Sequence, residues 1–153
     1  MSFINEDWHR GQTQGSAPTG LFLVQYPMFL NHAGVINKNE EDAVRFYKDF
    51  LGLEITKEWV VPAELSGQLF AISRDIRMLV FEKEGTKIEV FISPEYRNAT
   101  PDINHFGILV DNFSEIVEKV PQAGVELITG KTKDKTVYFI KDFSGNLIEI
   151  KQM

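Results

Sequence analysis

Two copies of one five-residue pattern decide the fold: NHAGV at residues 31–35 and NHFGI at residues 104–108. Each copy opens a unit that closes on a second matched segment, GTKIEV at 85–90 and GNLIEI at 145–150. Both opening segments contain a histidine, and in both closing segments a glutamate follows the glycine by four residues. The chain is therefore an internal duplication, in which one histidine and one glutamate occupy equivalent places in each half.

The composition is that of a globular protein of one domain. The chain has 153 residues, of which 43% are hydrophobic and 25% charged, close to the averages for soluble domains. A net charge of −6 without a visible basic patch argues against binding to nucleic acid through its phosphates. The absence of cysteine excludes disulfides, thiolate metal ligands and cysteine nucleophiles.

No membrane or export segment is expected. The apolar stretch at residues 21–30 contains Gln25 and Pro27 and is too short to cross a bilayer. It also lacks the order of charged, apolar and small residues that marks a signal peptide. These features predict a cytoplasmic protein with no membrane partner.

The chain divides into a leader and one duplicated domain. Residues 1–27, rich in glycine and small polar residues, are predicted to be flexible or draped over the surface. We expect a single domain at 28–153, with module one at 28–93, a linker at 94–101 and module two at 102–153.

Hydrophobic periodicity predicts the same order of elements in both modules. In module one we expect strands at 28–36, 53–61, 68–73 with 77–82, and 87–92, and a helix that starts after Asn37 or Asn39 and stops at Gly52. In module two we expect strands at 103–110, 125–129, 136–141 and 146–151, and a helix between Asp111 or Asn112 and Gly124. One strand, one helix and three strands, repeated, predict an α+β domain with pseudo-twofold symmetry.

Strand alternation places the two glutamates on one side of the predicted sheets. Glu89 and Glu149 are each flanked by aliphatic residues that should face a helix, so the glutamates should lie on the opposite, concave face. A carboxylate in an otherwise apolar strand is unfavourable unless it is paired or binds a cation.

Two imidazoles and two carboxylates, from His32, Glu89, His105 and Glu149, suit a divalent Ni, Co, Zn, Mn or Fe ion. Singly, each residue is readily explained as an ordinary strand histidine or as part of a solvated sheet face. Their matched occurrence in both halves favours a metal site.

These residues and their surroundings resemble the vicinal oxygen chelate superfamily, which includes glyoxalase I, methylmalonyl-CoA epimerase, fosfomycin-resistance proteins, extradiol dioxygenases and bleomycin-binding proteins. The resemblance lies in NHAGV at 31–35, AVRFY at 43–47, LGL at 51–53 and DFSGNLIE at 142–149. It implies two βαβββ modules whose curved mixed sheets surround one metal-centred cavity.

The resemblance further implies ligands at His32, Glu89, His105 and Glu149, the pattern of the glyoxalase I and epimerase branch. It implies a metalloenzyme that abstracts a proton next to a carbonyl, with Glu149 as the first choice for the general base and Glu89 as the second. Ile36 and Ser93 stand where glyoxalase I carries an arginine and an asparagine, so a glutathione adduct is not implied as the substrate.

Two other functions remain open. One is an Fe(II) dioxygenase that uses His32, His105 and Glu149 as a two-histidine, one-carboxylate triad. The other is a non-catalytic protein that binds or sequesters a small molecule. In each case the expected partners are a small molecule and a second copy of the chain, because relatives pair their modules within or between subunits.

Sequence alone leaves the substrate undefined. Four aromatic residues either line a cavity or belong to the core: Trp59, Phe70, Phe91 and Phe106. Four cations either attract an anionic substrate or are ordinary surface charges: Arg74, Arg77, Lys87 and Lys151.

Overall fold

A computed structural model describes residues 30–97 and 103–153. The strands are β1 Ala33–Asn37, β2 Glu54–Val61, β3 Ile76–Lys83, β4 Thr86–Ile92, β5 His105–Val110, β6 Glu126–Lys131, β7 Thr136–Lys141 and β8 Leu147–Gln152. The helices are α1 Glu40–Ala43, α2 Ala63–Phe70 and α3 Phe113–Ala123, and α1 continues directly as a π-helix, η1 Val44–Phe50. The predicted leader and positions 98–101 of the predicted linker lie outside the described residues.

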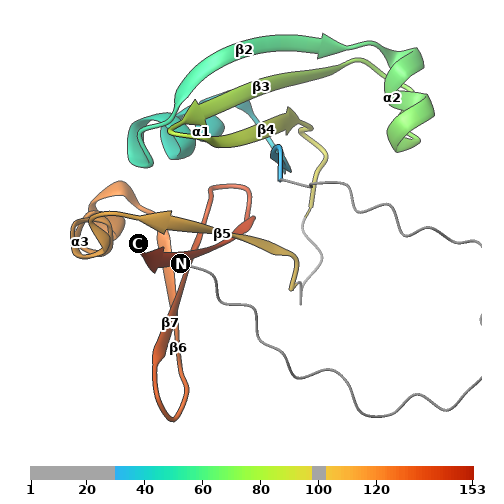
Figure 1. Ribbon diagram of the computed structural model, residues 1–153. Helices are drawn as coiled ribbons and strands as arrows, with labels where there is room; N and C mark the ends of the chain where they lie inside the picture. The colour runs from blue at the N-terminus through green and yellow to red at the C-terminus, as the bar shows by residue number, and fades with distance from the viewer. Residues whose placement is uncertain (1–29, 98–102) are drawn as a thin grey trace, which may run out of the picture.

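Each module forms its own four-stranded mixed sheet (Figure 1). The strand order is β1-β4-β3-β2 in module one and β5-β8-β7-β6 in module two. In both sheets the opening strand pairs in parallel with the closing strand, and the other neighbours are antiparallel. The prediction of two equivalent modules in an α+β fold is confirmed.

The helices of the two modules begin and end as the local sequence predicts. The side chains of Asn39 and Asn112 each accept a hydrogen bond from the backbone N–H three residues later, at 2.7 and 3.3 Å, as helix caps do. Gly52 and Gly124 follow the helices with φ of +74° and +69°, a conformation that glycine adopts without a steric penalty.

Two local predictions were wrong. Residues 68–73 do not form a strand, because the chain forms α2 there, with Leu65 and Leu69 one turn apart on the helix. The hydroxyl of buried Ser66 donates to the backbone carbonyls of the loop that follows and holds that loop against the helix. His32 lies one residue before β1 and not within the strand.

A single apolar core joins the two modules through their helix-bearing faces. The aliphatic residues that flank each glutamate are at most 1% exposed: Ile88, Val90, Ile148 and Ile150. They pack with the helices of both modules, including Phe46 and Tyr47 from η1 and Val120 from α3. The opposite sheet faces, which carry Glu89 and Glu149, are left uncovered by this core.

A buried polar contact also fastens module one to module two. The hydroxyl of Tyr47 donates to Oδ2 of Asp142 at 2.8 Å, and the side-chain amide of Asn146 donates to the backbone carbonyl of Ile36 at 2.9 Å. Burial, assisted by the charge of Asp142 and its hydrogen bond, raises the pKa of Tyr47 well above its usual range, so the phenol remains a donor at neutral pH.

No helix in the described parts of the chain has the length and apolar character needed to span a membrane.

Candidate metal centre

The first histidine–glutamate pair lies where β1 and β4 run side by side. Gly34 is opposite Glu89 in the parallel register, and His32 precedes Gly34 by two residues, which places it on the same face. Nε2 of His32 is 3.4 Å from Oε2 of Glu89, and its Nδ1 is 3.0 Å from Oδ1 of Asn31. The pair is therefore formed within module one.

The second pair repeats this arrangement on β5 and β8. Gly107 is opposite Glu149, and His105 precedes Gly107 by two residues on the same face. Nδ1 of His105 is 2.8 Å from the carbonyl oxygen of Ile103. Its ring contacts Phe139 edge-on, with 5.1 Å between the centroids.

The hydrogen bonds of both imidazoles suit metal ligation. In each ring Nδ1 faces an oxygen acceptor, which favours a proton on Nδ1 and leaves the lone pair of Nε2 available. In module one Nε2 faces the Glu89 carboxylate, so the two groups could share a proton or a cation. Two imidazole nitrogens and two carboxylates therefore fit a borderline divalent ion by their chemistry.

The two pairs do not come together within one chain. Among residues 30–97 and 103–153, no group of three or more His, Asp or Glu side chains is placed to hold a metal. The modules meet through their helix-bearing faces, so the described part of one chain does not bring the four predicted ligands into one group.

Glu149 forms an ion pair with a lysine on its own strand. Nζ of Lys151 lies 2.9 Å from Oε2 of Glu149. This hydrogen bond, and then the charges of Lys151, His105 and Lys135, lower the pKa of Glu149 below its ordinary value of 4.5, against an opposing effect of desolvation. The ionised pair stabilises the fold above the unfolded-state pKa, and this contribution is lost as the pH falls through the lower folded-state pKa.

We expect the Lys151→Gln substitution to raise the pKa of Glu149 toward its ordinary value in metal-free protein. The shift can be followed by carbon NMR titration of the side-chain carboxyls. Lys119→Gln is the matched control, because Lys119 pairs with Glu115 instead. An unchanged Glu149 titration in Lys151→Gln would contradict this account.

The candidate cations are mostly engaged elsewhere. Arg77 binds Glu40 and Glu58, and Lys87 pairs with Glu82 at 2.7 Å. Nη2 of Arg74 donates to the Ser93 hydroxyl at 2.7 Å. Ser93 thus has a polar partner on its own module.

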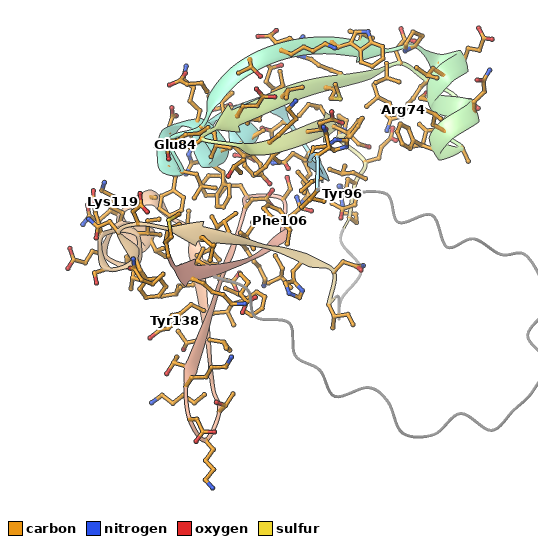
Figure 2. The ribbon with its side chains drawn as sticks, in the orientation of Figure 1. Arg74, Glu84, Tyr96, Phe106, Lys119 and Tyr138 are labelled. Atoms are coloured by element: carbon orange, nitrogen blue, oxygen red, sulfur yellow. The ribbon has the colours of Figure 1, made fainter. Side chains whose placement is uncertain are left out.

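Three of the four candidate aromatics gather beside Glu89. Trp59, Phe70 and Phe91 line one hollow, whereas Phe106 packs in the core between the modules (Figure 2). Sequence reasoning missed Leu65 and Leu69 as lining residues, although their four-residue spacing signals a helical face.

Two β-α-β-β-β modules with equivalent histidine–glutamate pairs define a duplicated α+β fold of the vicinal oxygen chelate type. The sequence profile of the Glyoxalase/Bleomycin resistance protein/Dioxygenase superfamily matches residues 29–150. The chain belongs to this superfamily, and the resemblance seen in the sequence is confirmed. No curated protein is significantly similar to the chain in sequence.

Several solved structures share the fold. A glyoxalase family protein from Enterococcus faecalis is 21% identical with a TM-score of 0.62, covering 80% of this chain and 95% of that one. The trypanothione-dependent glyoxalase I of Leishmania major is 16% identical with a TM-score of 0.61, covering 82% and 87%. The fosfomycin resistance protein FosX from Listeria monocytogenes is 16% identical with a TM-score of 0.62, covering 84% and 95%.

Proposed function

We propose that the protein is a divalent-metal-dependent, glyoxalase-like lyase, isomerase or epimerase that abstracts a proton next to a carbonyl. His32, Glu89, His105 and Glu149 hold the metal. One observation carries the proposal: both modules place a histidine and a glutamate on the same exposed face of adjacent parallel strands. In both, Nδ1 of the imidazole lies within hydrogen-bond distance of an oxygen, and in module one Nε2 faces the carboxylate of Glu89.

The metal centre is shared between two copies of the chain. The core joins the modules through the faces opposite Glu89 and Glu149, so one chain presents two half-sites that do not meet. A twofold dimer that sets module one of each copy against module two of the other assembles all four ligands twice. The protein therefore acts as a homodimer.

Each of the proposed ligands has a role in the proton transfer. His32, Glu89, His105 and Glu149 would hold a divalent cation, which would supply Lewis-acid stabilisation to the negative charge that develops on the carbonyl oxygen of the substrate. The Glu149 carboxylate accepts the proton from the carbon next to the carbonyl, while the electron pair of the broken C–H bond moves toward the carbonyl oxygen. Returning the proton to the same or the neighbouring carbon completes epimerisation or isomerisation. Glu89 is the second candidate for the base.

Metal uptake and proton exchange test this proposal together. Dialysed protein is supplied with Ni²⁺, Co²⁺, Zn²⁺, Mn²⁺ or Fe²⁺ in turn, and bound metal is measured after gel filtration. NMR in D₂O then follows deuterium entering the hydroxymethyl group of hydroxyacetone, a simple ketone with vicinal oxygens. We expect about one metal per chain and metal-dependent deuteration. If the protein takes up none of the five metals, the proposal is wrong and a non-catalytic binding protein is the better assignment.

Substituting Glu89 distinguishes the proposed four-ligand enzyme from a dioxygenase that uses only three ligands. In the proposed site, Glu89→Gln removes an anionic ligand, and we expect metal affinity and proton exchange both to fall by at least about tenfold. The exposed Glu64→Gln change on α2 is the control. If Glu89→Gln keeps Fe²⁺ and shows oxygen-dependent turnover, the dioxygenase is the better assignment.

A further inference from the structure

The two modules differ most in the connection between their second and third strands. In module two, β6 and β7 are joined by residues 132–135 alone. In module one, residues 62–75 intervene between β2 and β3 and include α2. Figure 1 shows α2 at one end of the long β2–β3 hairpin, with α1 at the other. This insertion is the main structural asymmetry of the duplicated fold.

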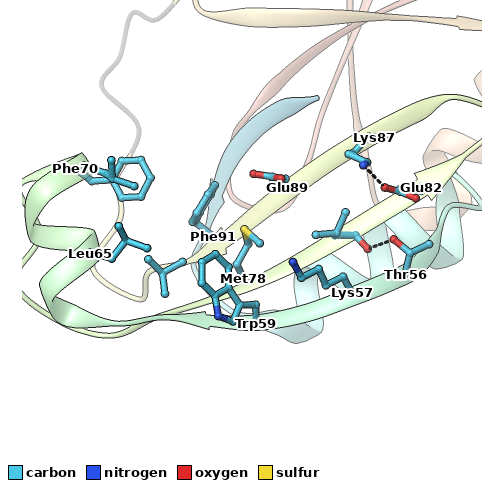
Figure 3. A pocket seen from close by; sticks show the side chains of 13 residues that line it. Thr56, Lys57, Trp59, Leu65, Phe70, Met78, Glu82, Lys87, Glu89 and Phe91 are labelled. Atoms are coloured by element: carbon cyan, nitrogen blue, oxygen red, sulfur yellow. Dashed lines mark hydrogen bonds and ion pairs between the residues drawn. The ribbon is translucent and has the colours of Figure 1, made fainter. Parts of the chain in front are cut away.

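The insertion borders an open hollow of about 330 Å³ on the Glu89 face of module one, which Lys57, Glu82 and Lys87 line at the end away from α2 (Figure 3). The register locates it: Phe91, Met78 and Trp59 lie side by side on β4, β3 and β2. This row is two residues along β4 from Glu89, about 7 Å at the usual strand rise. The apolar row therefore adjoins the proposed metal ligand.

The floor of the hollow is a second apolar cluster, separate from the core. It consists of Val61, Ile76, Met78 and Val80, all at most 4% exposed, and all of these except Ile76 line the hollow. At the mouth, large apolar side chains remain in water: Trp59 is 43% exposed, Phe70 47% and Leu69 62%. A buried apolar floor with exposed apolar walls is typical of a ligand-binding surface and not of a solvated sheet face.

Module two also has a hollow beside Glu149, but it lacks the row of large apolar side chains and the helix α2. The positions that correspond to Phe91, Met78 and Trp59 in its register are Lys151, Val137 and Gly130. The apolar wall thus belongs to only one side of each shared centre. A substrate between the two modules would meet these large apolar side chains on one side only.

We propose that this hollow binds an aryl or bulky alkyl group of the substrate, joined directly to the carbonyl unit held at the metal ligands. The inference rests on the proposed function and names its substrate class as aryl or branched-alkyl hydroxy ketones and their close relatives. An apolar cavity of about 150 Å³ already holds benzene, so the hollow accepts a single ring with room to spare. The short separation from Glu89 requires a direct attachment and not a long linker. Phe70 and Leu69, on α2, determine this specificity.

Two probes that differ only in this group test the inference. Hydroxyacetone carries a methyl group where 2-hydroxyacetophenone carries a phenyl ring. Binding to the Ni²⁺-loaded and the metal-free full-length dimer is measured by titration calorimetry, and deuteration of each probe by NMR in D₂O. We expect the wild-type protein to bind the aryl probe at least tenfold more tightly, because the ring is removed from water.

Two variants of α2 and one matched control test whether the preference for the aryl probe arises from the hollow. Phe70→Ala and Leu69→Ala should each weaken binding of the aryl probe by about threefold to tenfold and leave hydroxyacetone unaffected. Val60→Ala is the control, because Val60 is 45% exposed on the neighbouring position of β2 and points to the other face of the sheet. Both α2 side chains are largely exposed, so either variant suffices if the other fails to fold.

Equal affinity for the two probes in the wild-type protein would overturn the inference. So would a loss of dimer stability in Phe70→Ala, since the hollow would then be a subunit contact. Deuteration of both probes at equal rates rejects the hollow as a substrate site and leaves the proposed function standing. Tight binding of the aryl probe without deuteration supports the hollow as a binding site and contradicts the proposed proton-transfer function.

Discussion

Co-expressing two inactive variants, His32→Ala and His105→Ala, is expected to restore about a quarter of the wild-type metal content and proton-exchange activity. Each variant alone lacks one histidine in every site. In a mixed dimer, one site combines the intact module two of the His32→Ala chain with the intact module one of the His105→Ala chain, and the second site lacks both histidines. Random pairing makes about half of the dimers mixed, and one of their two sites is whole.

Bound Ni²⁺ per chain is the primary measurement, because it does not depend on knowing the natural substrate. The third histidine of the chain supplies the matched control: His9→Ala should retain full metal content. Each ligand variant by itself should lose at least about tenfold in metal affinity. If all four ligands of a site came from one chain, co-expression would restore no metal content, because every chain would lack a ligand of its own site.

Replacing Asp142 by alanine is expected to lower the free energy of unfolding by about 3 to 4 kcal/mol, the largest stability effect of a single substitution proposed for this protein. The side chain is only 4% exposed. It accepts hydrogen bonds from Tyr47 and the Asn146 amide, and from the backbone N–H groups of Ser144 and Asn146. Its removal leaves these buried donors without their acceptor, and the two modules lose their main polar link.

Urea unfolding measures this change, and the melting temperature should fall by roughly 2 to 4 °C for each kcal/mol. Tyr47→Phe is the graded control, because it deletes one donor and leaves Asp142 with its other partners; about 1 to 2 kcal/mol is expected. If Asp142→Ala destabilises the protein no more than Tyr47→Phe does, the turn at 142–146 is not what fastens the modules together.

The sequence by itself determined the duplicated α+β fold and the equivalent placement of the two pairs. Period-two alternation around Glu89 and Glu149 assigned each glutamate to the face opposite its aliphatic neighbours, and the structure buries those neighbours. Helix ends at Asn39 and Gly52 were predictable because capping side chains and left-handed glycines act locally. A shared ion would require the first and last strands of a module to be close, and in the structure β1 pairs with β4 and His32 lies beside Glu89.

Only the tertiary structure decided which faces of the modules meet. The aliphatic sides of both sheets form a single core, a long-range packing choice that strand periodicity does not encode. That choice separates the two histidine–glutamate pairs within the described part of a chain, and in the proposed dimer a second copy completes each site. The same limit explains the error at 68–73, where contacts between Ser66 and the loop at 72–74 stabilise a helix. Short apolar segments suit helix and strand alike until such distant contacts decide between them.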